Sequence, residues 1–433
     1  QLDRGFTLTD LAAGRPVEVE TLDDRGAYRT VRFLAADVPA LGYKVFHMER
    51  GTGAAAQPAA AGVTLENRFY RVTLDPARGA IRGIFDKQLS RELVDSAGPY
   101  RLNEYLFVTG GGTNTRQAQP WEYLPPAELT VNHARDGKLI SVERTPWGVV
   151  ARMEAAAEHT PRIVTEIRLP DDARRIEIDN RMTVDLLLTR MAAYFAFPWA
   201  ARQPTFRFDI ANGWFDPAKD LMEGGGSEWF NAQHWVNVED ADAAMGLATA
   251  SAPLVALGDI VRGRWPRRFA PASSAVFSYA LTNYWSSKWA GRKTGEFAYA
   301  YAITSAPKFD PGQMMRFGYE QRNPLEVSEI KASDRLPDQK GPLPPDQASL
   351  AALAPESLML TAAKGAEDGA GIVFRVMEIA GKDAEAKLTL PWSEIRSAHE
   401  ANSLEIAGAA LPHDAHTVSF HIGPHEVRTI RIE

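Results

Sequence analysis

The chain has 433 residues, of which 45% are hydrophobic and 24% charged, and it contains no cysteine. This composition is typical of a globular protein with several domains, and it excludes a disulfide framework, thiolate catalysis and thiolate metal sites. Lys and Arg number 48 against 55 for Asp and Glu, and the formal charge of −7 argues against a nucleic-acid partner, which needs a basic surface.

Residues 1–50 predict a small β-sandwich domain that is incomplete. They offer about four strands before the Leu41-Gly42-Tyr43 turn, and a lone sheet of that size hardly supplies a core. The chain begins at Gln1 without a basic and apolar leader, so we expect the missing strands and further chain to lie upstream.

Residues 51–62 (GTGAAAQPAAAG) are small side chains that bury little surface and predict a linker. Residues 63–330 then predict one large β-sandwich, because apolar and polar residues alternate there in segments rich in Val, Ile, Thr and aromatics. The expected strands are residues 64–74, 149–157, 163–169, 176–184, 205–210, 275–281 and 296–304. The longest nearly uncharged stretch, residues 191–201, is about half of the ~20 residues that a spanning helix needs, so we expect no membrane span.

Residues 331–357 concentrate Pro, Asp and Gln and predict a second linker, which leaves residues 358–433 for a C-terminal small β-sandwich. Amphipathic helical stretches are scarce, and residues 347–353 are one short exception. The fold class expected from the whole chain is therefore all-β, with a large sandwich flanked by two small ones.

Histidines cluster near the C-terminus, at positions 413, 416, 421 and 425. In a strand His413 and His416 would point to opposite faces, so the pattern favours a polar turn followed by an edge strand. We expect no metal site in this chain.

Two triple glycines, at residues 110–112 and 224–226, are flanked by aromatic and amide side chains. Such loops suit sugar recognition, because aromatic rings stack on sugar faces and amides bind hydroxyls. The alternative is that most of these aromatic residues belong to the sandwich core. Glycoside hydrolysis also needs a pair of carboxylates, and no pair can be assigned from the sequence.

Several motifs in order resemble the C-terminal region of glycoside hydrolase family 38, the α-mannosidases. They are residues 38–43 (VPALGY), 65–70 (LENRFY), 79–87 (GAIRGIFDK), 277–285 (FSYALTNYW) and 424–429 (PHEVRT). Physically these motifs specify a sheet: Gly79 suits a hairpin turn that needs a positive φ, and Asp86 with Lys87 marks the next turn.

The resemblance implies a galactose-mutarotase-like large sandwich flanked by two small ones. In the family, zinc and the two catalytic carboxylates belong to an N-terminal barrel and the helical bundle after it, and their His-x-Asp signature does not occur here. The resemblance therefore implies no catalytic residue and no cofactor in this chain, with zinc belonging to a missing catalytic domain. The implied partners are that N-terminal domain and an α-mannoside, and we expect the isolated chain to be inactive.

The resemblance also implies side chains that face the substrate. Tyr105 occupies the place where some members present a tyrosine to bound mannose, and Asn103 lies two residues before it. Asn283 and Trp285 are further candidates, expected mainly to order a loop of the large sandwich. Core packing is the competing interpretation of Tyr105 and Asn103.

Two other functions stay open. One is a stand-alone carbohydrate-binding or scaffold protein, and the other is an aldose mutarotase, which needs a His and a Glu on one sheet face. His159 with Glu166, or His234 with Glu228, would supply such a pair. The compartment is open as well, since a periplasmic or secreted location is compatible with the absence of cysteine.

Overall fold

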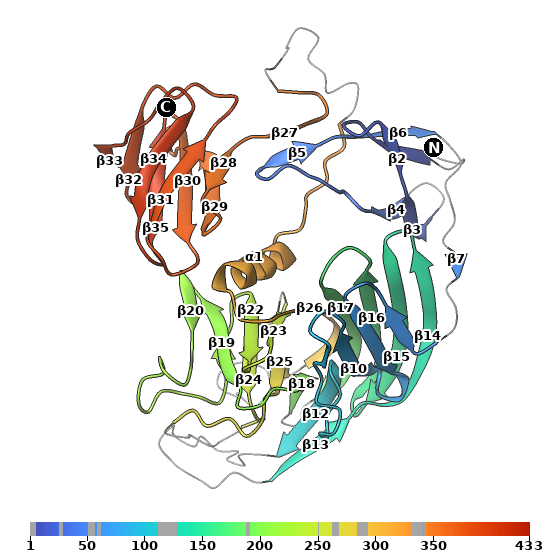
Figure 1. Cartoon of the computed structure of the whole chain (residues 1–433). Coiled ribbons are helices and arrows are strands. Elements are labelled where there is room, and N and C mark those ends of the chain that lie inside the picture. The colour runs from blue at the N-terminus through green and yellow to red at the C-terminus, as the bar shows by residue number, and fades with distance from the viewer. Residues whose placement is uncertain are drawn as a thin grey trace. The chain divides into compact units, whose positions relative to one another are not determined.

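A computed structural model of the chain describes residues 6–25, 29–50, 57–58, 62–110, 128–187, 191–249, 251–261, 268–283, 293–330, 341 and 343–433. The described residues form many β-strands and little helix (Figure 1). The chain divides into two compact units. One unit combines Gln1–Ala56 with Pro324–Glu433, and the other is Gln57–Asn323. The expected all-β class is confirmed.

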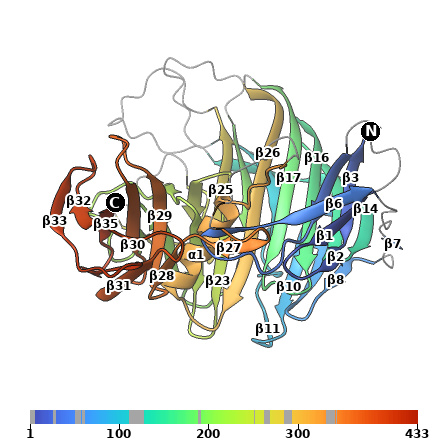
Figure 2. The same ribbon diagram turned by 90° about the horizontal axis from the view of Figure 1, so that it is seen from above.

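The Gln57–Asn323 unit contains a large antiparallel sheet. In spatial order its ten strands are β20 (Gly213–Phe215), β19 (Thr205–Ile210), β22 (Trp235–Glu239), β23 (Ala244–Ala248), β26 (Lys293–Ala306), β17 (Ile176–Leu187), β16 (Thr160–Pro170), β15 (Gly148–Ala157), β14 (Arg135–Thr145) and β7 (Gln57–Pro58). The long strands β26, β17 and β16 lie side by side in both views (Figure 2). Buried and partly exposed residues alternate along β15, β16 and β17, so this part of the sheet presents one face to the core and one to solvent.

Two further sheets complete this unit. The six-stranded sheet consists of β13 (Leu129–His133), β12 (Glu104–Gly110), β18 (Ala192–Phe197), β25 (Val276–Thr282), β24 (Leu254–Leu257) and β21 (Phe230–Asn231). The four-stranded sheet consists of β11 (Arg91–Glu92), β10 (Ala80–Asp86), β9 (Tyr70–Asp75) and β8 (Thr64–Glu66). One hydrophobic core takes residues from all three sheets, which makes the unit a sandwich.

The six-stranded sheet is buried on both faces. Along β12, Tyr105 and Phe107 enter the main core, whereas Leu106 and Val108 belong to a second cluster on the opposite, outer face. All six residues of β18 are buried for the same reason. The apolar run around residues 191–201 is thus a central strand of a sandwich rather than a helix.

The strands predicted from alternation are confirmed, with one interruption. Residues 64–74 form β8 and β9 with a turn between them, because the Asn67 side-chain oxygen accepts hydrogen bonds from the backbone N–H groups of Phe69 and Tyr70. Gly79 closes the 3-10 turn η1 (Pro76–Arg78) with a φ of 59°, as its place in the hairpin predicts. A Cβ at Gly79 would also lie 2.9 Å from Ala155 Cβ.

The prediction of a short helix at residues 347–353 is wrong. Residues Gln347–Ser349 form β27 and Ala352–Ala354 form β28, because their backbones pair with other strands. A seven-residue amphipathic pattern cannot outweigh two sets of ladder hydrogen bonds. The helix α1 (Pro311–Arg322) was not predicted from the sequence. It packs on β22 and β23, and the Asp310 side chain caps its N-terminus.

The Gln1–Ala56 and Pro324–Glu433 unit contains smaller sheets. The N-terminal strands are β1 (Phe6–Asp10), β2 (Arg15–Val17), β3 (Val19–Asp24), β4 (Arg29–Phe33), β5 (Gly42–Lys44) and β6 (Phe46–Arg50). The C-terminal strands are β29 (Leu358–Gly365), β30 (Ile372–Glu378), β31 (Ala384–Thr389), β32 (Ala398–Ala401), β33 (Ala407–Ala410), β34 (Thr417–Ile422) and β35 (Val427–Ile432). A three-stranded sheet of β28, β31 and β34 and a five-stranded sheet of β29, β30, β35, β32 and β33 enclose a separate hydrophobic core. Within this unit β5 pairs with β27, so strands about 300 positions apart in the sequence share a sheet.

The predicted linkers are only partly described. Residues 51–56, 59–61 and 331–340 lie outside the described residues. The domain boundaries predicted at 51–62 and 331–357 therefore stay predictions.

Candidate functional site

Tyr105 lies in the core of the large sandwich. Its side chain is 1% exposed, its ring meets Phe195 edge to face at 5.5 Å, and its hydroxyl lies 3.0 Å from Thr160 Oγ1. Burial raises the pKa of Tyr105 to about 12. Core packing accounts for these surroundings, and a contact of Tyr105 with substrate stays a prediction.

Asn103 has a structural environment of the same kind. Its φ is 61°, a left-handed conformation that Asn tolerates better than most residues, and it is 1% exposed. Its amide pairs reciprocally with that of Asn180, with both hydrogen bonds at 2.9 Å, and Thr165 donates to Asn180 Oδ1. This closed polar pair links the turn before β12 to the ten-stranded sheet.

Asn283 lies just after β25 and Trp285 lies outside the described residues. Asn283 is 6% exposed, and its side-chain oxygen accepts a hydrogen bond from Met191 N at 2.6 Å. Its own N–H donates to Met191 O at 3.1 Å. Asn283 thus ties the end of β25 to the start of β18, and roles for Asn283 and Trp285 in substrate binding stay predictions.

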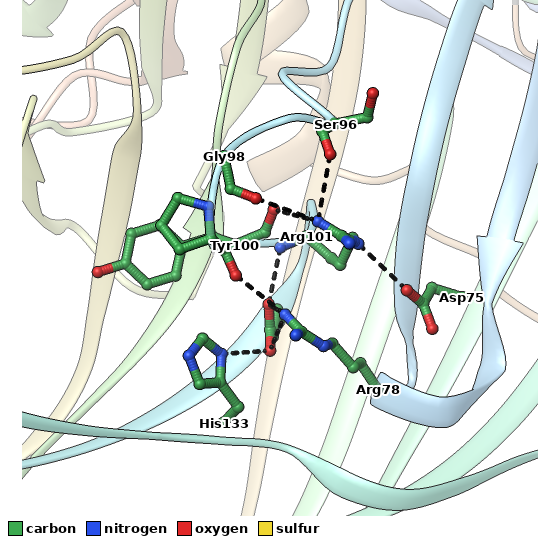
Figure 3. Close-up of polar contacts among 9 residues, drawn as sticks. Asp75, Arg78, Ser96, Gly98, Tyr100, Arg101 and His133 are labelled. Carbon is green, nitrogen blue, oxygen red and sulfur yellow. Dashed lines mark hydrogen bonds and ion pairs between the residues drawn. The ribbon is translucent and has the colours of Figure 1, made fainter.

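A cluster of charged side chains lies on the outer face of the six-stranded sheet. It includes Glu104, which precedes Tyr105 in the sequence but points to the opposite face of β12. Its centre is Glu104, whose side chain is fully buried. Arg78 Nη1 donates to both carboxylate oxygens at 3.2 Å, Arg101 N donates to Oε2 at 2.7 Å, and His133 Nδ1 donates to Oε1 at 2.8 Å (Figure 3). These partners compensate the buried negative charge.

The strand register brings this cluster together. Leu106 on β12 pairs with His133 on β13, and Glu104 pairs with Ala196 on β18. Ala196 in turn pairs with Phe277 on β25. On this face of the sheet the small Ala196 side chain therefore lies between Glu104 and the Phe277 ring. Glu104 and His133 are 29 positions apart in the sequence, and only the antiparallel pairing makes them neighbours.

The rim of the cluster is open to solvent. The side chains of Arg78 and His133 are 32% and 35% exposed. The Tyr100 ring lies 5.9 Å from the His133 ring and meets Phe277 edge to face at 5.3 Å. Burial, with Asp259 and Glu104 nearby, raises the pKa of Tyr100, so its phenol stays protonated at neutral pH.

The geometry suits binding and positioning of a polar ligand. Glu104 accepts from three residues, so its carboxylate is not a free base. His133 Nδ1 contacts a carboxylate oxygen that can only accept, so Nδ1 carries a proton in either charge state of the ring. A partly exposed imidazole, a guanidinium and an aromatic ring form a surface that hydroxyl groups can bind.

The pairs considered for mutarotase chemistry have other partners. His159 lies 3.8 Å from Glu158, while Glu166 is paired with Arg152 and Arg168. His234 is bonded to Asp209 at 2.6 Å. A His and a Glu that meet on one face of the six-stranded sheet, His133 and Glu104, were not predicted. The glutamate inside the apolar segment NEYLFV was a signal, because a buried carboxylate needs a cationic partner.

Three of the four C-terminal histidines contact backbone or carboxylate oxygens. His413 and His416 contact backbone carbonyls, and His421 lies 3.3 Å from Asp383. Within the part of the chain that the structure describes, no group of three or more His, Cys, Asp or Glu side chains would hold a metal ion. No helix among the described residues is long and apolar enough to cross a membrane.

Two family models match the chain. The glycosyl hydrolases family 38 C-terminal domain matches residues 65–253, and the family 38 C-terminal beta sandwich domain matches residues 357–430. Together they cover more than half of the 433 residues. No curated protein sequence matches the chain.

Solved structures share the fold over nearly the whole chain. An alpha-mannosidase from Enterococcus faecalis V583 matches 99% of this chain with a TM-score of 0.71 at 14% identity. A family 38 protein from Enterococcus faecalis matches 99% of it with a TM-score of 0.70, also at 14% identity. This chain spans about half the length of these two proteins, 51% and 53%.

A putative aldose 1-epimerase from Escherichia coli K12 matches 57% of this chain and 98% of its own length, with 11% identity and a TM-score of 0.34. A likeness at that level carries no argument about activity. The two family matches confirm the resemblance seen in the sequence motifs. The chain therefore belongs to glycosyl hydrolase family 38, of which it forms the C-terminal β-sandwich region.

Proposed function

We propose that this chain is the non-catalytic C-terminal region of an α-mannosidase, which packs on a catalytic domain and completes its substrate site. The observation that carries the proposal is the pair of family 38 C-terminal matches, together with the shared fold over 99% of this chain and half of an alpha-mannosidase. Zinc and the catalytic carboxylates would belong to the catalytic domain, and the substrate would be an α-mannoside.

The rim of the Glu104 cluster is the part of the chain best suited to face that substrate. Arg78 and His133 are held by a fully buried carboxylate yet remain about one-third exposed. Such preorganised side chains lower the entropic cost of binding a sugar, because they are already ordered before it binds. Tyr105, Asn103, Asn283 and Trp285 stay as proposed substrate contacts from the sequence resemblance.

The first test is hydrolysis of an aryl α-mannoside by the purified chain with added zinc. We expect no turnover, whereas the complete protein translated from the same gene, with its catalytic domain, should hydrolyse the substrate. Turnover by the chain alone that survives repeated purification would contradict a non-catalytic role. A complete protein without α-mannosidase activity would contradict the assignment to an α-mannosidase.

The second test addresses the Glu104 cluster in the complete protein. His133→Ala and Arg78→Ala should raise KM for the mannoside about fivefold or more, since each removes one ligand hydrogen bond. Arg135→Ala is the matched control, because Arg135 is 67% exposed and pairs only with its neighbour Asp136 among the described residues. An unchanged KM in both cluster variants, with folding intact, would exclude this face from substrate binding.

A further inference from the structure

A tryptophan side chain lies at the surface of the C-terminal β-sandwich, in the turn after β31. Trp392 is 39% exposed, and no other Trp or Phe among the described residues is exposed to that extent. No aromatic ring or cation among those residues stacks on it. Exposure alone does not mark a site, because single apolar side chains are common at protein surfaces. Two further features distinguish Trp392: its ring is held in one orientation, and polar side chains follow it in the turn.

The orientation of the indole is fixed by a hydrogen bond. Trp392 Nε1 donates to Ser349 O at 2.8 Å. Ser349 belongs to β27 and pairs with Gly42 on β5, so this acceptor has a fixed position. An indole has one N–H group, and with that donor used internally the exposed part of the ring offers apolar surface and π-electrons. A ring that is already ordered loses little conformational entropy when a ligand binds.

The turn that carries Trp392 is anchored at both ends. Leu390 and Ile395 are 5% and 4% exposed and belong to the core of the C-terminal sandwich. Leu390 N donates to His416 O and Ile395 N donates to Ala415 O, each at 2.8 Å. Residues 391–394 between these anchors are all exposed, so the turn presents its side chains from a fixed base.

Polar groups in and beside this turn can bind hydroxyl groups. Ser393 and Glu394 follow Trp392 and are exposed, and the Glu394 carboxylate has no hydrogen-bond or ion-pair partner among the described residues. His416 Nδ1 donates to Ser393 O at 3.0 Å, which holds the exposed imidazole next to the turn. A carboxylate can accept from two neighbouring hydroxyl groups, and a serine hydroxyl can donate or accept.

These features together indicate the ligand class. A pyranose has an apolar face of C–H groups and a rim of hydroxyl groups, which match an aromatic ring beside a carboxylate. A typical protein partner covers about 800 Å² on each side, far more than one ring, and the Glu394 charge disfavours an anionic ligand. We propose that Trp392 is the stacking surface of a site for a neutral pyranose, whose hydroxyl groups donate to Glu394. The inference does not rest on the proposed function, because it uses neither the catalytic domain nor the Glu104 cluster.

Fluorine NMR on the whole chain, labelled with fluorotryptophan, tests this proposal. The Trp392 resonance is the one that Trp392→Phe removes. We expect methyl α-mannopyranoside or methyl α-glucopyranoside at millimolar concentration to shift it, while the resonances of the buried Trp199 and Trp235 stay in place. Erythritol is the acyclic control and should shift none of them.

Saturation-transfer NMR then compares the affinities of variants for the same pyranosides. Trp392→Ala should weaken binding about tenfold, through the loss of the stacking surface, and Glu394→Ala about fivefold, through the loss of a hydroxyl acceptor. Ile406→Ser is the matched control, because Ile406 is a 62% exposed apolar residue of the same sandwich, and it should leave binding unchanged. If Trp392→Ala fails to fold by circular dichroism, Glu394→Ala decides, because Glu394 is exposed.

Three outcomes would overturn the proposal. They are a Trp392 resonance that no pyranoside shifts, binding that neither Trp392→Ala nor Glu394→Ala weakens, and an equal shift with erythritol. Sedimentation velocity separates a sugar site from an apolar docking surface, because Leu350, 47% exposed, follows Ser349 in the chain. Self-association that Trp392→Ala and Leu350→Ser both reduce, without a pyranoside shift, would show such a docking surface instead and would also overturn the proposal.

Discussion

Neighbouring residues on one strand have opposite roles in this sandwich. Tyr105 enters the apolar core and Glu104 enters a charged cluster, because successive side chains of β12 point to opposite faces. The Tyr105 phenol is bonded to Thr160, which is itself fully buried. The carboxylate of Glu104 is compensated by Arg78 and His133, which lie on other elements. At the residue scale, the face of the strand decides the chemistry.

Tyr105→Phe should lower the free energy of unfolding by about 1 kcal/mol at neutral pH, because Thr160 loses its partner. The pKa of Tyr105 is raised from 10 to about 12 by burial, so the folded state favours the neutral phenol. Its stabilisation is therefore complete below pH 10 and is lost as the pH rises from 10 through about 12. Urea unfolding at neutral pH and near pH 11 measures both effects, and the variant should lose less stability in alkali than the wild type.

Thr160→Val is the matched change on the other side of that hydrogen bond. The double variant should lose less free energy of unfolding than the sum of the losses in the two single variants, because both single changes remove the same hydrogen bond. Additive losses of unfolding free energy would contradict a hydrogen bond between Tyr105 and Thr160. A loss of stability at alkaline pH that Tyr105→Phe leaves unchanged would contradict the raised pKa of Tyr105.

At the scale of elements, a buried carboxylate joins the four-stranded sheet to the ten-stranded one. Asp86 ends β10, and its Oδ1 accepts from the backbone N–H groups of Gln88 and Leu89 at 2.9 Å, which closes the predicted turn. Its Oδ2 accepts from Arg174 Nη2 at 2.5 Å and from Ser305 Oγ at 2.6 Å. The Asp–Lys motif seen in the sequence therefore specifies a turn and also a link between sheets.

Arg174→Met should lower the free energy of unfolding by about 3 kcal/mol, because the fully buried Asp86 would keep its charge without a cationic partner. Arg135→Met is the control on an exposed ion pair and should change stability by less than ~0.5 kcal/mol. Chemical denaturation of both variants measures the difference. Equal effects would show that the Asp86 link is no stronger than a surface pair.

At the scale of the whole molecule, the two units have separate hydrophobic cores. The core of the Gln57–Asn323 unit includes Ile167, and that of the unit with Pro324–Glu433 includes Leu388, both fully buried. Because neither core contains residues of the other unit, each unit has its own source of hydrophobic stability.

Calorimetry of the chain should therefore show two unfolding transitions. Ile167→Ala should lower one of them and Leu388→Ala the other, each by about 3 kcal/mol of unfolding free energy. A single transition that both substitutions shift equally would mean that the units unfold as one cooperative body.

The all-β class, most strands of the large sandwich and the family are predictable from the sequence alone. Strands such as β15, β16 and β17 carry their period of two in the local order of residues, so alternation predicts them directly. The helix α1 was missed because glycines at positions 312 and 318 weaken its local signal, whereas its stability comes from packing on β22 and β23.

Which residues meet depends on how the strands and the helix pack. Strand register places His133 beside Glu104, and a hydrogen bond between residues 43 positions apart in the sequence holds the Trp392 ring at Ser349. The tertiary structure also shows that Tyr105 packs in the core, while a contact of Tyr105 with a sugar stays a prediction. The period of the side chains is a local property of the chain, whereas a site depends on hydrogen-bonded pairing and packing between residues far apart in the sequence.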